Sequence, residues 1–491
     1  MRDSPTVCEM SVVLPSKLER LSARLPFMSG IYPTIRRPSF IIIAVAVYVS
    51  LRIMPPLAGL PASGQAVLAI AGAGTVLWMT EALPVGITGL AILALLACEP
   101  AIGARNAFSG FASEVTIFLI GIVGISAGVE TSGLAERGAQ ALLTLSRGEP
   151  RRLYWQMIVA FPAMAFVLPS AITRNAILVP AYENVLKVSE IDQSGRLKRA
   201  IMLSLGMLNP LASSALLTGG IVSIAAASLL GGFSWLWWFC LMAPPYYMLM
   251  LGGAGVVRLM VGPFPPGNCT ETPSLADKSL RPNEIRTLGV LAATCALWFT
   301  DSIHHWSPAV PALLGAIALQ LPGIGVVTWK QFETRLSWNL IITIAASMSL
   351  AAAMTETGAA AWLGRWFVDH LPTLANHPMF FLIGLMTAST VIHLAITNLA
   401  ACVSLLLPIT ITVAQTAGLS SVVCGLVVTL NINAVVLYPA QTAVNMMAYD
   451  RGYFSAGDVR RLGLAMFVLT LLIALCAIPY WELLGLPLKS R

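Results

Sequence analysis

The chain has 491 residues, of which 57% are hydrophobic and only 10% are charged. An average soluble domain has roughly 25% charged residues, so this composition excludes a soluble globular protein. The apolar residues form blocks of about 18–25 residues along the whole chain, the length that crosses a hydrocarbon core of about 30 Å. Because only short polar joints separate the blocks, we predict an all-α polytopic membrane protein with about 11 transmembrane helices.

The N-terminal arm, residues 1–37, is rich in Arg but has no long apolar core, so it lacks the pattern of a cleavable secretory signal. We predict a cytoplasmic arm, followed by a first transmembrane helix over 38–62. The alternative start residues are Met1, Met10 and Met28.

Membrane orientation follows from where the cations lie. If the arm is cytoplasmic, counting spans places the polar linker 261–286 in the cytoplasm as well and the C-terminus outside. Most of the 29 Lys and Arg then lie on the cytoplasmic side, as the positive-inside rule requires. We therefore predict a multi-pass protein of the plasma membrane, in a bacterium the inner membrane. The net charge of +7 reflects this topology within the lipid bilayer, and we expect no nucleic-acid partner.

An internal repeat divides the rest of the chain. Residues 129–135 (VETSGLA) recur as residues 354–360 (MTETGAA), and the segment from Ala171 to Asn175 recurs from Ala395 to Asn398. We assign a first repeat to 63–260 and a second to 287–491. Each would contain five full spans, and an odd number inverts the second copy in the membrane, as in many secondary transporters.

Two polar-tipped apolar segments predict re-entrant hairpins, at about 153–186 from the cytoplasm and about 377–415 from outside. Non-helical backbone at membrane depth is tolerated only inside protein or along a wet cavity. Helix N-termini at such tips suit an anion, whereas carbonyl oxygens of broken helices suit a small cation. The alternative is that the polar residues only cap the returning helix.

Two interrupted helices would face the tips. Asn209-Pro210 and Thr218-Gly219-Gly220 interrupt the first, and residues 439–445 (PAQTAVN) interrupt the second. Proline removes a helix donor and glycine loosens the backbone, so both are expected to unwind, with simple packing kinks as the alternative. The predicted substrate-binding residues are Ser170, Thr173, Arg174, Asn175, Thr218, Thr397, Asn398 and Thr442, and the predicted cation-binding residues are Ser170, Gly219, Thr397, Asn398 and Gln441.

Arg174 is the single residue that most strongly indicates a function. A guanidinium at membrane depth costs at least a few kcal/mol unless it is paired, and its planar fork fits a carboxylate or a sulfate-like group. The alternatives are a salt bridge to an embedded carboxylate such as Glu130, or a side chain that snorkels to the interface.

Other groups point away from enzyme or metal chemistry. The eight cysteines show no C-x-x-C pair and lie mostly in apolar runs, so neither disulfides nor a metal site is indicated. No nucleophile motif or His-Glu-x-x-His occurs, so we predict no enzymatic activity and no catalytic residues.

His393 could titrate as a proton-coupling group, although a neutral packing histidine is more common. Glu81, Glu130 and Glu356 are expected to cap or anchor helix ends.

A family resemblance extends from about residue 40 to 486. The run Met79-Thr80-Glu81-Ala82-Leu83-Pro84 resembles the T-E-A-x-P signature of divalent anion:sodium symporters, and the order of hairpin and broken helix, repeated twice, is similar to that family. The resemblance implies a homodimer with a scaffold part and a mobile transport part, and elevator-type alternating access in which both hairpins travel with the substrate.

The hairpin tips differ from the family's Ser-Asn-Thr pattern. The first tip keeps only Ser170 and adds Arg174, and the nearest match in the second is Thr397-Asn398. Relatives with an arginine in the first tip resemble carboxylate exchangers. We predict a secondary active transporter of small divalent organic anions such as C4 and C5 dicarboxylates, by sodium symport or by exchange. We expect no cofactor, and Na⁺ would serve as the coupling ion in the symport alternative. The alternatives are a sulfate or sulfonate permease and, in another class, a cation/proton antiporter.

Overall fold

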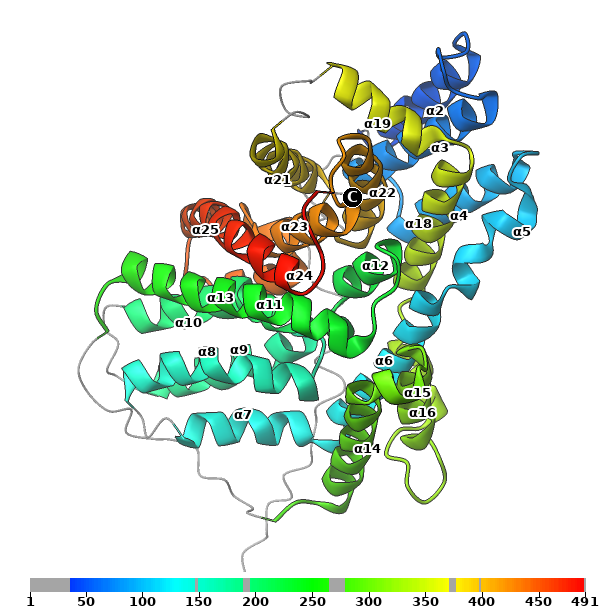
Figure 1. Cartoon of the computed structure of the whole chain (residues 1–491). Coiled ribbons are helices and arrows are strands. Elements are labelled where there is room, and N and C mark those ends of the chain that lie inside the picture. Colours follow the sequence, from blue (N-terminus) through cyan, green and yellow to red (C-terminus); the bar gives the residue numbers. More distant parts are fainter. Residues whose placement is uncertain are drawn as a thin grey trace, which may run out of the picture.

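The computed structural model describes residues 36–145, 149–188, 195–264, 279–370, 377–396 and 399–489. Within them the regular structure is helical, apart from one isolated β-bridge between Leu419 and Lys489, which confirms the all-α prediction. Six of the described helices are long and apolar enough to cross a membrane by length and composition. Several shorter helices pack between them (Figure 1).

The first half of the chain begins with α2 (Arg36–Ile53), which ends earlier than the predicted first span 38–62 because Pro55 and Pro56 follow it. Its further helices are α3 (Ala62–Thr80), α4 (Val85–Cys98), α5 (Gly103–Ala107), α6 (Glu114–Ser132), α7 (Leu134–Leu145), α8 (Pro150–Val167), α9 (Ala171–Val188), α10 (Arg196–Met207), α11 (Asn209–Ser214), α12 (Ile221–Leu229) and α13 (Trp235–Val261).

The second half runs through a parallel series. Its helices are α14 (Pro282–Phe299), α15 (Asp301–His304), α16 (Ala309–Ala318), α17 (Trp329–Arg335), α18 (Trp338–Glu356), α19 (Ala359–His370), α21 (Pro378–Ala395), α22 (Leu399–Thr416), α23 (Ser421–Ala434), α24 (Ala443–Tyr449) and α25 (Ala456–Leu483). In this order α6 corresponds to α18, the pair α8 and α9 to α21 and α22, and α13 to α25.

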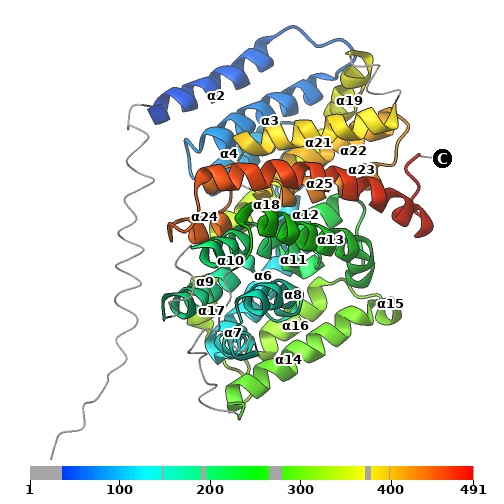
Figure 2. The ribbon, with the colours of Figure 1, turned by 90° about the vertical axis from the view of Figure 1, so that its left-hand side faces the viewer.

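Contacts between helices of the two halves occur in equivalent pairs. Helix α6 packs on α16, and its counterpart α18 packs on α4, the counterpart of α16. Helix α12 contacts α22 of the second hairpin, and α24 contacts α9 of the first, while α13 and α25 pack on each other. Two halves related by a two-fold axis make contacts of this kind, so the packing supports the repeat. Figure 2 shows the helices in layers, with α2 and α14 at opposite ends. The inversion across the membrane stays a prediction.

The glycine of the repeated motif has a local explanation. Gly133 follows α6 with a φ of 81°, and Gly358 follows α18 with a φ of 73°. Helices commonly end at a residue in this left-handed conformation, which glycine adopts without a steric penalty. The chain then turns into the amphipathic helices α7 and α19, each of which leads to a hairpin.

Glycines on one face of α6 allow a close approach to α16. A Cβ on Gly121 would lie 2.7 Å from the carbonyl carbon of Ala312, and one on Gly124 would lie 2.5 Å from the Ala316 Cβ. Small residues at such spacing let two membrane helices pack backbone against backbone, where van der Waals contact supplies much of the stability. These residues therefore fix α6, and with it the chain that enters the first hairpin.

We predict that Gly121→Ala lowers the melting temperature of the purified protein, because the new methyl group meets backbone atoms of α16. Overpacking of this kind costs typically about 1–3 kcal/mol. Gly138→Ala on α7 is the matched control, since its Cβ would meet nothing within 4 Å. Thermal unfolding in detergent should separate the two variants. Equal melting temperatures would contradict the close packing of α6 on α16.

Candidate functional site

The first hairpin turns at residues 168–170, between α8 and α9. The Ser170 Oγ accepts a hydrogen bond from the backbone N–H of Thr173 at 3.3 Å. This contact caps the start of α9, as the capping alternative expects. Both side chains remain partly exposed, so a role of Ser170 and Thr173 in substrate binding stays a prediction.

Arg174 lies one turn into α9 and is fully buried, with 0% of its surface exposed. Its Nη1 donates to the carbonyl oxygens of Leu168, at 2.5 Å, and Pro169, at 3.0 Å. Its Nε donates to Asn209 Oδ1 at 2.8 Å, and its Nη2 donates to the Asn209 carbonyl at 3.0 Å and to Ser213 Oγ. A guanidinium has five N–H donors, so every one of them is used by protein oxygens. We call these five acceptors the Arg174 cage.

The cage combines two interruptions of helical structure. The Leu168 and Pro169 carbonyls are available because α8 ends at Val167, and Asn209 stands at the joint of α10 and α11, where Pro210 occupies the first turn. Helix ends leave carbonyl groups without an intrahelical partner. The guanidinium supplies the missing donors, so its burial and the broken backbone stabilise each other.

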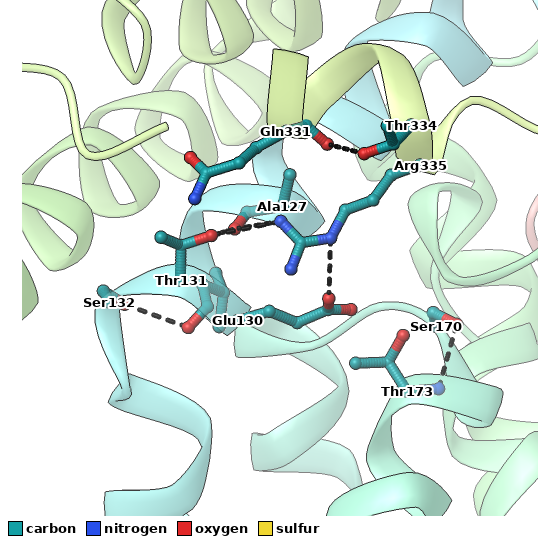
Figure 3. A network of polar contacts seen from close by, with 10 residues as sticks. Ala127, Glu130, Thr131, Ser132, Ser170, Thr173, Gln331, Thr334 and Arg335 are labelled. Carbon is teal, nitrogen blue, oxygen red and sulfur yellow. Dashed lines mark hydrogen bonds and ion pairs between the residues drawn. The ribbon is translucent and has the colours of Figure 1, made fainter. Parts of the chain in front are cut away.

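Neither alternative for Arg174 occurs in the structure. The side chain does not snorkel, because it is completely enclosed. It does not pair with Glu130, whose Oε2 lies 3.2 Å from Nε of Arg335 instead (Figure 3). Arg335 stands at the end of α17, more than two hundred residues further along the chain. No local sequence pattern indicated that it would pair with Glu130.

Asn175 connects the first hairpin to both interrupted helices. Its Nδ2 donates to the Leu205 carbonyl on α10, at 2.9 Å, and to the Val444 carbonyl on α24, at 3.2 Å. Its Oδ1 accepts from Asn209 Nδ2 at 2.7 Å. Asn175 therefore uses its amide to join the first hairpin with the second half of the chain.

The first interruption lies at residues 215–220, between α11 and α12, and includes a short 3₁₀ turn, Leu217–Gly219. A Cβ at Gly219 would lie 1.7 Å from the Ser213 carbonyl oxygen, so only glycine allows the backbone to fold back this closely. Thr218 is buried beside it, 3% exposed. The predicted unwinding is confirmed here, and ligand binding by Thr218 and Gly219 stays a prediction.

The second interruption separates α23 from α24 and includes a 3₁₀ turn, Pro439–Gln441. Thr442 caps α24 by accepting from the Asn445 N–H at 3.3 Å. The buried Gln441 amide accepts from the Leu437 N–H at 2.7 Å, and its Nε2 lies 3.0 Å from His393 Nδ1 on the second hairpin. Thr397 and Asn398, the predicted residues of the second tip, lie outside the described residues.

Some buried polar atoms have no hydrogen-bond partner in the described part of the chain. They include His393 Nε2, Asn431 Oδ1 and Asn445 Oδ1. Buried polar atoms normally have a partner, so these atoms are candidates for contact with a ligand. The sequence patterns had not selected Asn209, Ser213 or Asn445 as ligand-binding residues, although two of them stand in the segments predicted to unwind.

The arrangement defines a class of protein: a multi-pass membrane protein whose polar centre combines the first hairpin tip with two interrupted helices. The family described as "Sodium:sulfate symporter transmembrane region" matches residues 38–486. The chain belongs to this family of divalent anion:sodium symporters, and it is a transporter rather than an enzyme.

Several relatives support this membership. A "Membrane protein" of Cupriavidus necator is 26% identical, with 90% of this chain and 92% of the relative covered. An "L-tartrate/succinate antiporter" of Shigella dysenteriae is 25% identical, with 75% and 78% covered. Among solved structures, the Alcanivorax borkumensis YdaH transporter aligns with a TM-score of 0.54 at 16% identity, over 85% of this chain and 100% of that one, which indicates a shared fold.

We predict that Arg174→Lys destabilises the protein, because an ammonium has three donors for the five acceptors of the cage. A buried acceptor left without a donor costs about 1–3 kcal/mol. Arg460→Lys, an exposed position on α25, is the matched control. The melting temperature of the purified variants measures the difference. A value for Arg174→Lys equal to that of the control would contradict the cage.

Proposed function

We propose that this chain is a secondary active transporter of small divalent organic anions, with C4 and C5 dicarboxylates as the first class, and that it works by anion exchange. The observation that carries the exchange mechanism is the Arg174 cage. Carbonyl and hydroxyl oxygens of broken helices are the ligands with which transporters hold a coupling cation. In this chain a guanidinium attached to the backbone occupies those ligands.

A tethered cation has a different consequence from a bound ion. Sodium that binds and dissociates couples transport to its own gradient. The positive charge of Arg174 instead stays at the first hairpin throughout the transport cycle. Sodium then supplies no driving force at the first hairpin, and exchange against a counter-anion is the simplest replacement. The similarity to an L-tartrate/succinate antiporter supports this direction.

The anion would bind where helix N-termini and polar tips converge. The N-terminus of α9 carries partial positive charge beside the partly exposed Ser170 and Thr173. Thr442 stands in the second interruption, which Asn175 and Gln441 hold near the hairpins. Thr218 stands in the first interruption. We propose that Thr397 and Asn398 complete the site, and that any remaining sodium site uses Gln441 with this second tip.

We further propose an elevator-type mechanism in a homodimer of the bacterial inner membrane, with the N-terminus in the cytoplasm. The family resemblance supports the dimer and the elevator, and the distribution of Lys and Arg supports the orientation. The reciprocal packing of the two halves supports two equivalent end states, because exchange of the two sets of contacts would interconvert them.

A sulfate or sulfonate permease is the second candidate, favoured by the description of the matched family. A cation/proton antiporter is less favoured, because such proteins normally place an aspartate in mid-membrane. The buried aspartates among the described residues, Asp301 and Asp458, both lie in the first turn of a helix.

We predict that proteoliposomes containing the protein take up labelled succinate when they are preloaded with unlabelled dicarboxylate, with or without a sodium gradient. Uptake should fall to the level of protein-free liposomes when no internal anion is present. Sulfate and sulfonates, tested as internal anions, distinguish the second candidate. A rate that requires sodium and ignores the internal anion would contradict exchange.

A second prediction concerns the cage itself. Arg174→Ser removes the tethered cation and leaves the backbone oxygens and Asn209 in place, so sodium should enter and stabilise the variant by binding linkage. We expect its melting temperature to rise in sodium chloride relative to choline chloride by more than that of the unchanged protein. Arg460→Lys again serves as control. An equal response of both proteins would show that these oxygens do not form a cation site.

A further inference from the structure

The end of α6 lies against the first hairpin tip. Val129 shares an apolar cluster with Leu168, and Val167 and Ile177 pack against it from the two arms of the hairpin. The next residue, Glu130, lies at the same end of α6. Figure 3 shows this carboxylate between Arg335 and the pair Ser170 and Thr173.

This side of the tip is partly exposed at the surface of the structure. The Glu130 and Arg335 side chains are 28% and 35% exposed, and Ser170 and Thr173 are partly exposed. In contrast, Arg174 and Asn175, the next residues of α9, are 0% exposed. The tip thus has a buried side, which contains the cage, and a partly exposed side, which faces Glu130.

Arg335 is held over the end of α6 by three acceptors. Its Nε pairs with Glu130 Oε2 at 3.2 Å, and its Nη1 donates to Thr131 Oγ1 at 3.1 Å and to the Ala127 carbonyl at 3.4 Å. The C-terminal end of a helix carries partial negative charge, which adds to that of the carboxylate. Without Arg335, this side of the tip would repel an anion.

We propose that Arg335 is a specificity-determining residue, which neutralises Glu130 and the end of α6 so that a dianion can approach the first hairpin tip from its exposed side. This inference rests on the proposed transport of divalent anions. The proposal gives the short helix α17 a role. Helix α17 packs on α6 and so positions the Arg335 cation beside Glu130.

The charge of the substrate gives the proposal a quantitative form. The Coulomb energy between a fixed charge and a ligand is proportional to the ligand's charge. If loss of Arg335 weakens the apparent affinity for a monoanion about threefold, the same loss should weaken that for a dianion about tenfold, the square of the first factor. A purely structural defect would reduce both by similar factors.

The test measures succinate counterflow and its inhibition by unlabelled succinate and by monomethyl succinate, a monoanion of similar shape, at neutral pH. Arg335→Gln should weaken succinate about tenfold and the ester about threefold, in line with the charge ratio. Adding Glu130→Gln to this variant should restore most of the loss, and Glu130→Gln alone should favour succinate further. Arg335→Lys keeps the charge and should stay close to the unchanged protein.

Lys330→Gln is the matched control, because it removes one cation from the exposed face of the same helix. It should leave the ratio of the two affinities unchanged. Equal losses for succinate and the ester in Arg335→Gln, or no restoration in the double variant, would overturn the proposal while counterflow by the unchanged protein continues. Absence of counterflow in the unchanged protein would overturn the proposed function itself, and this inference with it.

Discussion

A fully buried guanidinium is stable only when its N–H groups have acceptors, and the first hairpin is organised around that requirement. Arg174 obtains two acceptors from the residues that follow α8 and three from Asn209 and Ser213. The Leu168 and Pro169 carbonyls are free because α8 stops at Val167. The hairpin turn, the joint of α10 and α11, and the buried cation are therefore one unit, and the remaining contacts of the site are arranged around it.

The second half of the chain has no arginine in its hairpin segment or in its interrupted helix. Gln441 and His393 join the second interruption to α21, and the described part of the site holds polar atoms there without a partner. Asn175 links the two halves through the Val444 carbonyl. The first hairpin thus carries a buried cation, Arg174, whereas the second hairpin relies on neutral polar groups. A functional difference between the two hairpins follows from this difference in charge.

The sequence predicted much of this architecture because the relevant signals are local. Apolar block length gave the membrane helices, and Pro210, Gly219 and Pro439 marked the interruptions through backbone geometry. The motif around Gly133 and Gly358 located the ends of α6 and α18, where a positive φ is needed. What could not be predicted was which groups pair. Glu130 finds Arg335 across the fold, and no local pattern encodes that contact.

By itself, the sequence determined the class of protein, the repeated order of its elements and the polar residues of the two tips. These depend on composition, periodicity and steric limits of single residues. Only the tertiary structure decided that Arg174 faces inward to five protein oxygens rather than outward to a carboxylate, and that Arg335 rather than Arg174 neutralises Glu130. The reason is physical: the partner of a buried charge is set by the geometry of distant segments brought together in space, and chain order does not contain it.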